Sequence, residues 1–276
     1  MFELLQKIFG GGTKKLPPAV EARLKLAQSC PQNVLLPRVP GAGSVEKGHV
    51  LTHNGLRLSK ESLGNNSDWQ LLQANGGVLE PQQEFAFAEV ARTLPNMPTM
   101  LDVGARSGFY SMWLKMMRPG ARCVMVEPNL QFLKNGQKNF ETNKLKSQSL
   151  GAYIGRKGGR TVEGVPVMTL LEVVNKVKTD YLSILLADIQ GYELELVTGA
   201  EPLLKERAID NIIISTHANA LHNECRNFLQ EYRYNVLVDI PPTRAYSPDG
   251  LLVVRRKELK GLETLGLEAR SEAPKA

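Results

Sequence analysis

The residues best suited to chemistry lie where an apolar run ends in Asp102 and continues into the glycine-containing turn 104–108. A strand that leads through a glycine-rich turn into a helix commonly holds a nucleotide-like cofactor in α/β proteins. A dinucleotide fingerprint would place glycines at positions 104, 106 and 109, but Arg106 and Phe109 stand at two of them. The acid at the strand tip instead suits a cofactor with a cationic end, such as the sulfonium and ammonium groups of S-adenosylmethionine.

A second acid, Glu127, ends the next apolar run. It stands 19 residues after Gly108, close to the spacing of about 20 residues at which a carboxylate accepts hydrogen bonds from ribose hydroxyls in nucleotide-binding α/β units. Taken alone, Glu127 can equally be a solvated acid at a strand end. Together with the glycine turn, it predicts a ribose site.

A third acid, Asp188, ends another apolar run and precedes Gly191, which opens a helix. Ligands of doubly wound sheets bind at the carboxyl ends of the strands, near the point where the strand order reverses. We therefore expect Asp188 in the same crevice as Asp102. His217 follows the run 212–216 and is expected there too, although a lone histidine at this place can also be a hydrogen-bonded loop residue.

A regular alternation of strands and helices positions these side chains. Apolar runs predict strands at 99–105, 122–127, 147–154, 181–188, 212–216, 235–238 and 251–254. Helical periodicity predicts helices at 82–94, 109–117, 130–142, 168–177, 193–206 and 221–232. This pattern indicates a Rossmann-like, doubly wound α/β fold with a mostly parallel seven-stranded sheet. The last two strands have no helix between them and should form an antiparallel hairpin at the sheet edge.

The ends of the chain lie outside this alternation. Residues 1–80 are expected to form an N-terminal extension with a short amphipathic helix at 1–9, a linker or wrapping arm at 17–45, and a hairpin that turns at Asn54-Gly55. The helix can pack on the parent domain or make a weak membrane or partner contact. Residues 257–276 are polar and charged, and are expected to be a flexible tail.

Composition narrows the class of protein. The 276 residues are 42% hydrophobic and 22% charged, with a formal net charge of +6, which is ordinary for a globular protein. Lysine and arginine are scattered, which argues against a nucleic-acid partner. No apolar run is long enough for a bilayer and no secretory signal is evident. With three widely spaced cysteines, these features predict a cytoplasmic protein, a membrane-peripheral one being the alternative. The sequence sets no oligomeric state.

The other histidines predict no metal site. His49 and His53 share one face of a strand but diverge too far to ligate one ion, and no third ligand is apparent. Both are expected at the surface, as are His222 and Glu224 on the helix at 221–232.

Three motifs together resemble those of the FkbM-type methyltransferases, which depend on S-adenosylmethionine and mostly O-methylate sugars or secondary metabolites. These motifs are Leu101-Asp102-Val103-Gly104-Ala105-x-x-Gly108-Phe109-Tyr110-Ser111, Val126-Glu127-Pro128-Asn129, and Asp188-Ile189-Gln190-Gly191-Tyr192-Glu193-Leu194-Glu195. The last motif is the most particular to the family. The resemblance covers roughly residues 80 to 255, so residues 81–256 are expected to form the methyltransferase domain.

The resemblance also implies roles for individual residues. Asp102, Gly104 and Gly108, with Ala105 and Arg106 between the glycines, would form the turn that binds the methionine end of the cofactor. Glu127 would bind the ribose, and the adenine would lie near Ala152. Asp188 and Glu193 would face the acceptor, although Glu193 can simply be a favourable acid in the first turn of a helix. The family usually has Asn where this chain has Arg106, whose guanidinium can bind the methionine carboxylate or face solvent.

The implied reaction is displacement at the sulfonium methyl group, for which no metal is required. The protein must align the acceptor oxygen, the methyl carbon and the sulfur, and a base must take the hydroxyl proton. Asp188 and His217 are both candidates for that base. The sequence does not identify the acceptor beyond a small-molecule or glycan hydroxyl. The alternatives are a nucleic-acid methyltransferase, which would be expected to carry an Asn/Asp-Pro-Pro-aromatic motif, and a non-catalytic scaffold with this fold.

Overall fold

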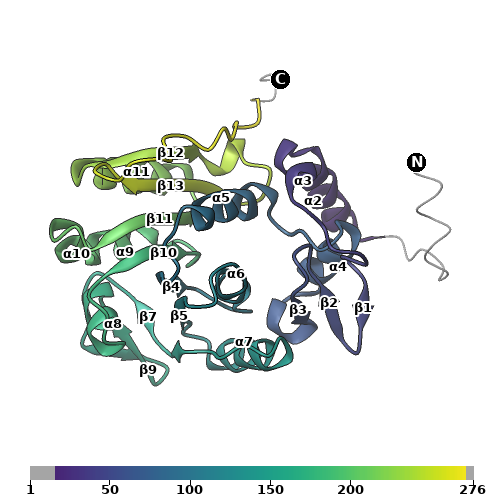
Figure 1. The fold of residues 1–276 in the computed structure, drawn as a ribbon, viewed down its shortest axis with the longest axis horizontal. Coiled ribbons are helices and arrows are strands. Elements are labelled where there is room, and N and C mark those ends of the chain that lie inside the picture. Colours follow the sequence, from purple (N-terminus) through teal and green to yellow (C-terminus); the bar gives the residue numbers. More distant parts are fainter. Residues whose placement is uncertain (1–15, 272–276) are drawn as a thin grey trace.

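A seven-stranded sheet forms the centre of the computed structural model, which describes residues 16–271 (Figure 1). Its strand order is β12-β13-β11-β10-β4-β5-β6. The strands, in that order, span Tyr234–Ile240, Gly250–Arg256, Ile209–Thr216, Leu182–Ala187, Thr99–Val103, Arg122–Val126 and Ser149–Leu150. Strands β11, β10, β4, β5 and β6 are parallel to one another. Strand β13 is antiparallel to both β11 and β12, which confirms the predicted fold and its edge hairpin.

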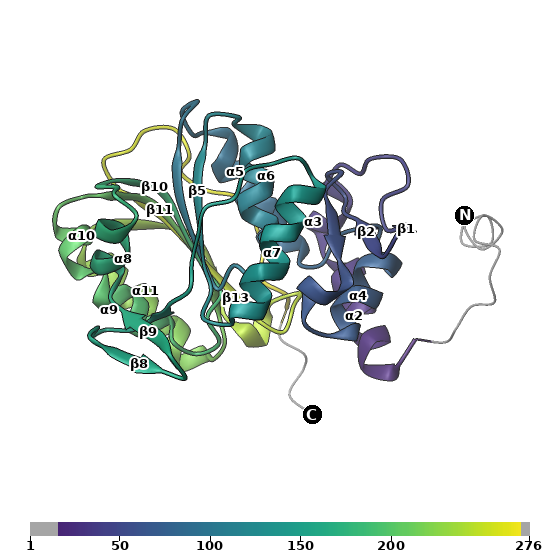
Figure 2. The ribbon, with the colours of Figure 1, turned by 90° about the horizontal axis from the view of Figure 1, so that it is seen from below.

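Helices cover both faces of this sheet (Figure 2). One face carries α5 (Pro81–Arg92), α6 (Phe109–Met117) and α7 (Leu130–Thr142). The other carries α8 (Leu170–Lys176), α9 (Glu193–Gly199), α10 (Glu201–Lys205) and α11 (Asn219–Glu231). The single helix expected at 193–206 is thus two helices, because Pro202 cannot continue the hydrogen-bond ladder of α9. Within residues 16–271 no helix has the length and apolar character needed to cross a membrane.

The hydrophobic core is divided between the two faces by the alternation of side chains along each strand. In β4 and β10, Met100 and Ile184 pack on the side of α5–α7. Their neighbours Leu101 and Leu185 pack on the side of α8–α11. Successive side chains of a strand point to opposite faces, so strands this apolar must be covered on both sides.

The strand expected at 147–154 is divided between two sheets. The first part of that segment is β6 of the main sheet, and the second part is β7 (Tyr153–Ile154) of a smaller sheet. Strand β7 pairs with β9 (Val165–Met168), which pairs with β8 (Arg160–Val162). The three-residue helix η2 (Pro242–Arg244) lies in the loop between β12 and β13.

The N-terminal extension is more structured than expected. Its elements are α2 (Pro18–Ser29), α3 (Pro31–Leu35), β1 (Val45–Glu46), β2 (His49–Leu51), β3 (Arg57–Ser59), η1 (Lys60–Leu63) and α4 (Asn66–Ala74). The pairing of His49 with Ser59 and of Leu51 with Arg57 confirms the hairpin. The presumed linker holds two helices because Pro18 and Pro31 stand at helix starts, where a missing N–H costs nothing. The helix expected at 1–9 falls outside the described residues.

Two histidines expected at the surface are fully buried. His53 places Nε2 3.1 Å from Oε2 of Glu84 and hydrogen-bonds through Nδ1 to the backbone oxygen of Pro37. Burial lowers the pKa of His53, but the hydrogen bond and charge of Glu84 outweigh it, so the pKa is raised. His222 lies between Thr216 and Asp239 at 2.8 Å from each. In both cases polar partners distant in sequence offset the free-energy cost of burying the imidazole ring. The local sequence pattern does not reveal these partners.

The C-terminal segment also differs from expectation as far as Ser271. Leu265 is buried at 8% exposure. The side-chain amide of Gln82 donates to the backbone oxygen of Glu268 at 3.1 Å. The backbone amide of Arg270 donates to the backbone oxygen of Arg244 at 2.8 Å. Residues 257–271 therefore pack along the main domain rather than leaving it.

We expect a chain that ends at Lys257 to unfold at a lower temperature than the full chain, by about 2 °C or more, because it loses the burial of Leu265 and these hydrogen bonds. Thermal unfolding followed by circular dichroism measures the difference. A chain ending at Ser271 is the matched control, since it keeps every one of these contacts. Equal unfolding temperatures for all three chains would show that the segment adds no stability.

Candidate functional site

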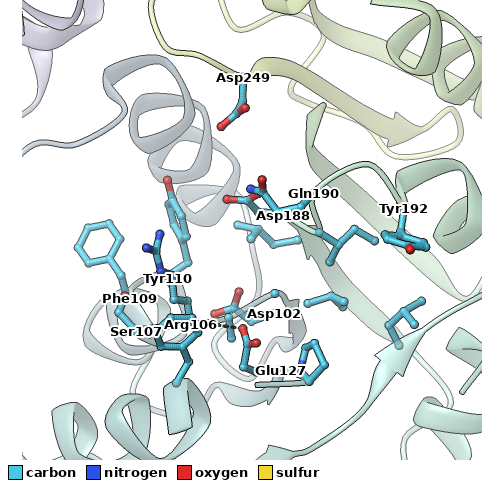
Figure 3. A pocket seen from close by; sticks show the side chains of 18 of the residues that line it. Asp102, Arg106, Ser107, Phe109, Tyr110, Glu127, Asp188, Gln190, Tyr192 and Asp249 are labelled. Carbon is cyan, nitrogen blue, oxygen red and sulfur yellow. Dashed lines mark hydrogen bonds between the residues drawn. The ribbon is translucent and has the colours of Figure 1, made fainter. Parts of the chain in front are cut away.

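A cavity of about 880 Å³ opens at the carboxyl ends of β4, β5 and β10. Its wall includes the three acids Asp102, Glu127 and Asp188, which the sequence predicts to share a crevice (Figure 3). The N-terminal extension and the small sheet complete the wall, with Asp68 from α4 and Arg160 from β8 among their contributions. The volume is typical of pockets that bind ligands of cofactor size.

The turn after β4 is held by backbone geometry that requires glycine. Gly104 has φ +77°, and a side chain there would overlap the backbone oxygen of Asp188. Gly108 has φ +72°, and its Cβ would come within 2.7 Å of Sδ of Met125. Gly104 and Ala105 line the cavity, whereas Gly108 lies behind its wall, against the core. Gly108 therefore shapes the turn without facing the cavity, a placement that differs from the expected contact with the cofactor.

Asp102 is anchored at the start of α6. Its Oδ2 accepts hydrogen bonds from the amide and the hydroxyl of Ser111, at 3.2 and 2.7 Å. Asp102 is only 2% exposed, and burial raises the pKa of its carboxyl group to about 6 against the effect of these hydrogen bonds. The charges of Asp188 and Glu127 raise the pKa further. A cation bound nearby would stabilise the ionised form.

Glu127 is fixed by two backbone amides. Its Oε2 accepts from the amide of Arg106 at 3.1 Å (Figure 3). Its Oε1 accepts from the amide of Asn129 at 2.9 Å. Burial raises its pKa, although both hydrogen bonds oppose the shift. Each carboxylate oxygen can accept a further hydrogen bond, so the group can still bind a pair of hydroxyls. Ala152, buried in the segment before β7, lines the same cavity.

Arg106 does not extend freely into solvent. Its Nη1 lies 3.2 Å from Oδ2 of Asp68, and its guanidinium stands over the ring of Phe132, 5.5 Å from the centroid. The backbone of Arg106 has φ +44°, a left-handed conformation that non-glycine residues seldom adopt. The unusual backbone lets one residue bind Glu127 through its amide and Asp68 through its side chain.

A cluster of four ionisable groups forms the opposite part of the site. His217 hydrogen-bonds through Nδ1 to Oε1 of Glu193 at 2.5 Å, and its Nε2 lies 3.4 Å from both Asp188 and Asp249. Glu193 also accepts from the amide of Gly191 at 3.0 Å. Asp188 and Asp249 line the cavity, whereas His217 and Glu193 stand behind them. The structure therefore brings all the predicted acceptor-side residues together but leaves two of them off the cavity wall.

The surroundings of His217 decide its charge. Burial disfavours the protonated ring, but the hydrogen bonds to Asp188 and Glu193 and the charge of Asp249 outweigh it and raise its pKa to about 10. An imidazole that keeps its proton at neutral pH is not available to accept one from a hydroxyl group. Of the two candidate bases, Asp188 alone lines the cavity.

Several residues of the cavity wall were not foreseen from the sequence, among them Glu80, Tyr110 and Asp249. In the sequence, Asp249 is part of a Pro-Asp-Gly turn. The pairing of Thr216 with Gly250 is what places it beside His217. Burial, followed by the charges of Asp188 and Asp249, raises the pKa of Glu80 well above its ordinary value. In Figure 3 the side chain of Asp249 points toward Asp188 and the hydroxyl end of Tyr110. Contacts between distant segments created this part of the wall.

Solved structures with similar folds are distant from this chain. M. capricolum TrmK bound to S-adenosylhomocysteine shares 16% identity at a TM-score of 0.44, over 65% of this chain and 73% of that one. The ribosomal protein L11 methylase of Lactobacillus delbrueckii subsp. bulgaricus shares 16% identity at 0.46, over 63% and 78%. The precorrin-6y C5,15-methyltransferase of Geobacter metallireducens shares 14% at 0.44, over 65% and 90%. A comparison with curated protein sequences found no match.

A family model gives the decisive comparison. Residues 102–236 match the methyltransferase FkbM domain. The matched segment begins at Asp102 and contains the glycine turn, Glu127, Asp188 and His217. Residues 102–236 are therefore an FkbM domain of the S-adenosylmethionine-dependent methyltransferases.

Proposed function

We propose that this methyltransferase transfers a methyl group to a hydroxyl group of a sugar, a glycan or a secondary metabolite. The observation that carries the proposal is the pair Asp188 and Asp249 on the cavity wall, backed by the His217 imidazolium. Ionised carboxylates only accept hydrogen bonds, so this wall suits an acceptor that presents several hydroxyl donors. The same charges would repel the phosphates of a nucleic acid.

The residues of the cavity fit S-adenosylmethionine in this arrangement. Glu127, with both oxygens held by backbone amides, is assigned to the ribose hydroxyls. Asp102 is assigned to the cationic end of the cofactor, and Ala152 to the wall of the adenine site. Gly104 and Ala105 let the backbone approach the ligand, while Gly108 holds the turn from behind. Residues 81–256 form the methyltransferase domain in this assignment, and the N-terminal extension closes one side of its cavity.

When bound, S-adenosylmethionine supplies an electrophilic methyl group on a sulfonium, which is already a good leaving group. Asp188 accepts a hydrogen bond from the acceptor hydroxyl and so aims its oxygen. Asp188 would take the proton that the hydroxyl loses as its oxygen displaces sulfur from the methyl carbon; the C–S bond would break and S-adenosylhomocysteine would leave. His217, held by Glu193, is a positioning residue that fixes Asp188 and offsets the charge of Asp249. Alignment of this kind can lower a barrier by several kcal/mol.

Mass spectrometry tests the choice of acceptor. The protein is incubated with S-adenosylmethionine and a panel of glycans and small polyols, and products are screened for a gain of about 14 Da, the mass of one methylene. We expect the gain on a hydroxyl-bearing compound and its loss when the hydroxyls are acetylated beforehand. Methylation confined to amines or to nucleic-acid bases would overturn the proposal.

Substitutions on the acceptor side should separate the base from its positioning residue. Asp188→Asn keeps the shape of the side chain but cannot take a proton, so turnover should fall about 10²-fold while S-adenosylmethionine binding stays near wild type. His217→Gln should lower turnover less and change its pH dependence. His49→Gln, at a half-buried histidine outside the cavity wall, is the matched control. Normal turnover of Asp188→Asn on the true acceptor would place the base elsewhere.

The raised pKa of Asp102 predicts how cofactor binding responds to pH. Above about pH 6 the carboxyl group is ionised and attracts a cation, and below it the attraction is lost. Affinity for S-adenosylmethionine, measured by calorimetry, should therefore fall as the pH drops from 7 to 5. Asp102→Asn should bind more weakly at pH 7 and lose this dependence. An unchanged pH response in that variant would assign the titration to another group.

A further inference from the structure

One acid of the N-terminal extension is shared by two arginines of the cavity wall. Oδ1 of Asp68 lies 2.8 Å from Nη1 of Arg23, and its Oδ2 lies 3.2 Å from Nη1 of Arg106. The amide side chain of Asn65 donates to the same carboxylate at 2.8 Å. Three distant parts of the chain, α2, α4 and the turn after β4, therefore meet at one buried carboxylate.

This cluster carries one positive charge in excess, whereas the rest of the wall is acidic. The other acids that line the cavity are Glu80, Glu84, Asp102, Glu127, Asp188, Glu195 and Asp249. Among the described residues of the wall, Arg160 is the one further arginine or lysine. Nε of Arg23 is buried and has no hydrogen-bond partner. An anionic group that enters the cavity is therefore attracted to Arg23 and Arg106.

We propose that Arg106 and Arg23 bind the carboxylate of the amino-acid part of S-adenosylmethionine. The amide of Arg106 already holds Glu127, so the ribose site and this guanidinium belong to the same turn. That turn runs past Gly104 and Asp102, where the ammonium group is assigned. An α-amino acid presents both charges together, and the site offers a carboxylate and a guanidinium to match them.

Asp68 and Phe132 act as positioning residues in this arrangement. A long arginine side chain loses conformational freedom when it binds. The ion pair with Asp68 and the contact with the Phe132 ring hold the Arg106 guanidinium in place before the ligand arrives. The N-terminal extension therefore completes the cofactor site by holding Arg106, which stands where the family usually has Asn.

Binding calorimetry with two ligands tests the inference, which rests on the cofactor and not on the proposed acceptor. S-adenosylhomocysteine carries the amino-acid group, and 5′-methylthioadenosine lacks it. Arg106→Gln should weaken binding of S-adenosylhomocysteine at least tenfold and leave that of 5′-methylthioadenosine within twofold. Arg23→Gln should act in the same direction. Arg160→Gln removes the same charge from another part of the wall and should leave the ratio of the two affinities unchanged.

The pattern across ligands separates the outcomes. Equal weakening of both ligands in Arg106→Gln would mean that the residue supports the turn rather than the carboxylate, and would overturn the inference. An unchanged affinity for S-adenosylhomocysteine in both arginine variants would overturn it as well, even if acceptor binding suffered. Thermal unfolding of each variant confirms that it is folded. Since no acceptor is present, failure of the proposed hydroxyl specificity would leave these results unaffected.

Discussion

The site depends on how closely β4 and β10 approach each other where they end. The amide of Asp188 donates to the backbone oxygen of Val103 at 2.9 Å, and that of Gly104 donates to Val126 at 2.8 Å. A side chain at position 104 would overlap the backbone of Asp188. These strands flank the point where the strand order reverses, which is where ligands of doubly wound sheets bind. The close contact thus brings the acids that follow β4, β5 and β10 into one cavity.

What the sequence revealed about this site was local. Asp102, Glu127 and Asp188 end apolar runs, and a parallel sheet places the ends of its strands along one edge, so their convergence could be predicted. Asp249 and Asp68 could not be assigned in this way. Asp249 reaches the cavity because β13 inserts beside β11, and Asp68 reaches it because the extension folds against the turn after β4. Such contacts depend on packing between distant segments, which periodicity does not encode.

The same limit explains the errors over histidine. The local sequence did not mark His53 and His222 as buried, because their polar partners Glu84 and Asp239 are distant in sequence. His217 was placed correctly at a strand tip, but its protonation follows from carboxylates on three other segments. Its pKa, raised from 6.5 to about 10, means that the charged cluster stabilises the fold fully below about pH 6.5. That stabilisation is lost as the pH rises through about 10.

The net charge of +6 does not reveal the acidic cavity. The electrostatic attraction that a ligand experiences depends on the charges near it rather than on the sum over the whole chain. Within the cavity, positive and negative charges are also unevenly distributed. Acids predominate around Asp188, whereas Arg23 and Arg106 share one carboxylate at the extension. Both Asp68 and Asp249 lie outside the segment 102–236 that matches the family. The shared motifs therefore build the strand ends and the turn with their own charges, and residues on either side of them add further charges to the space where the ligands meet.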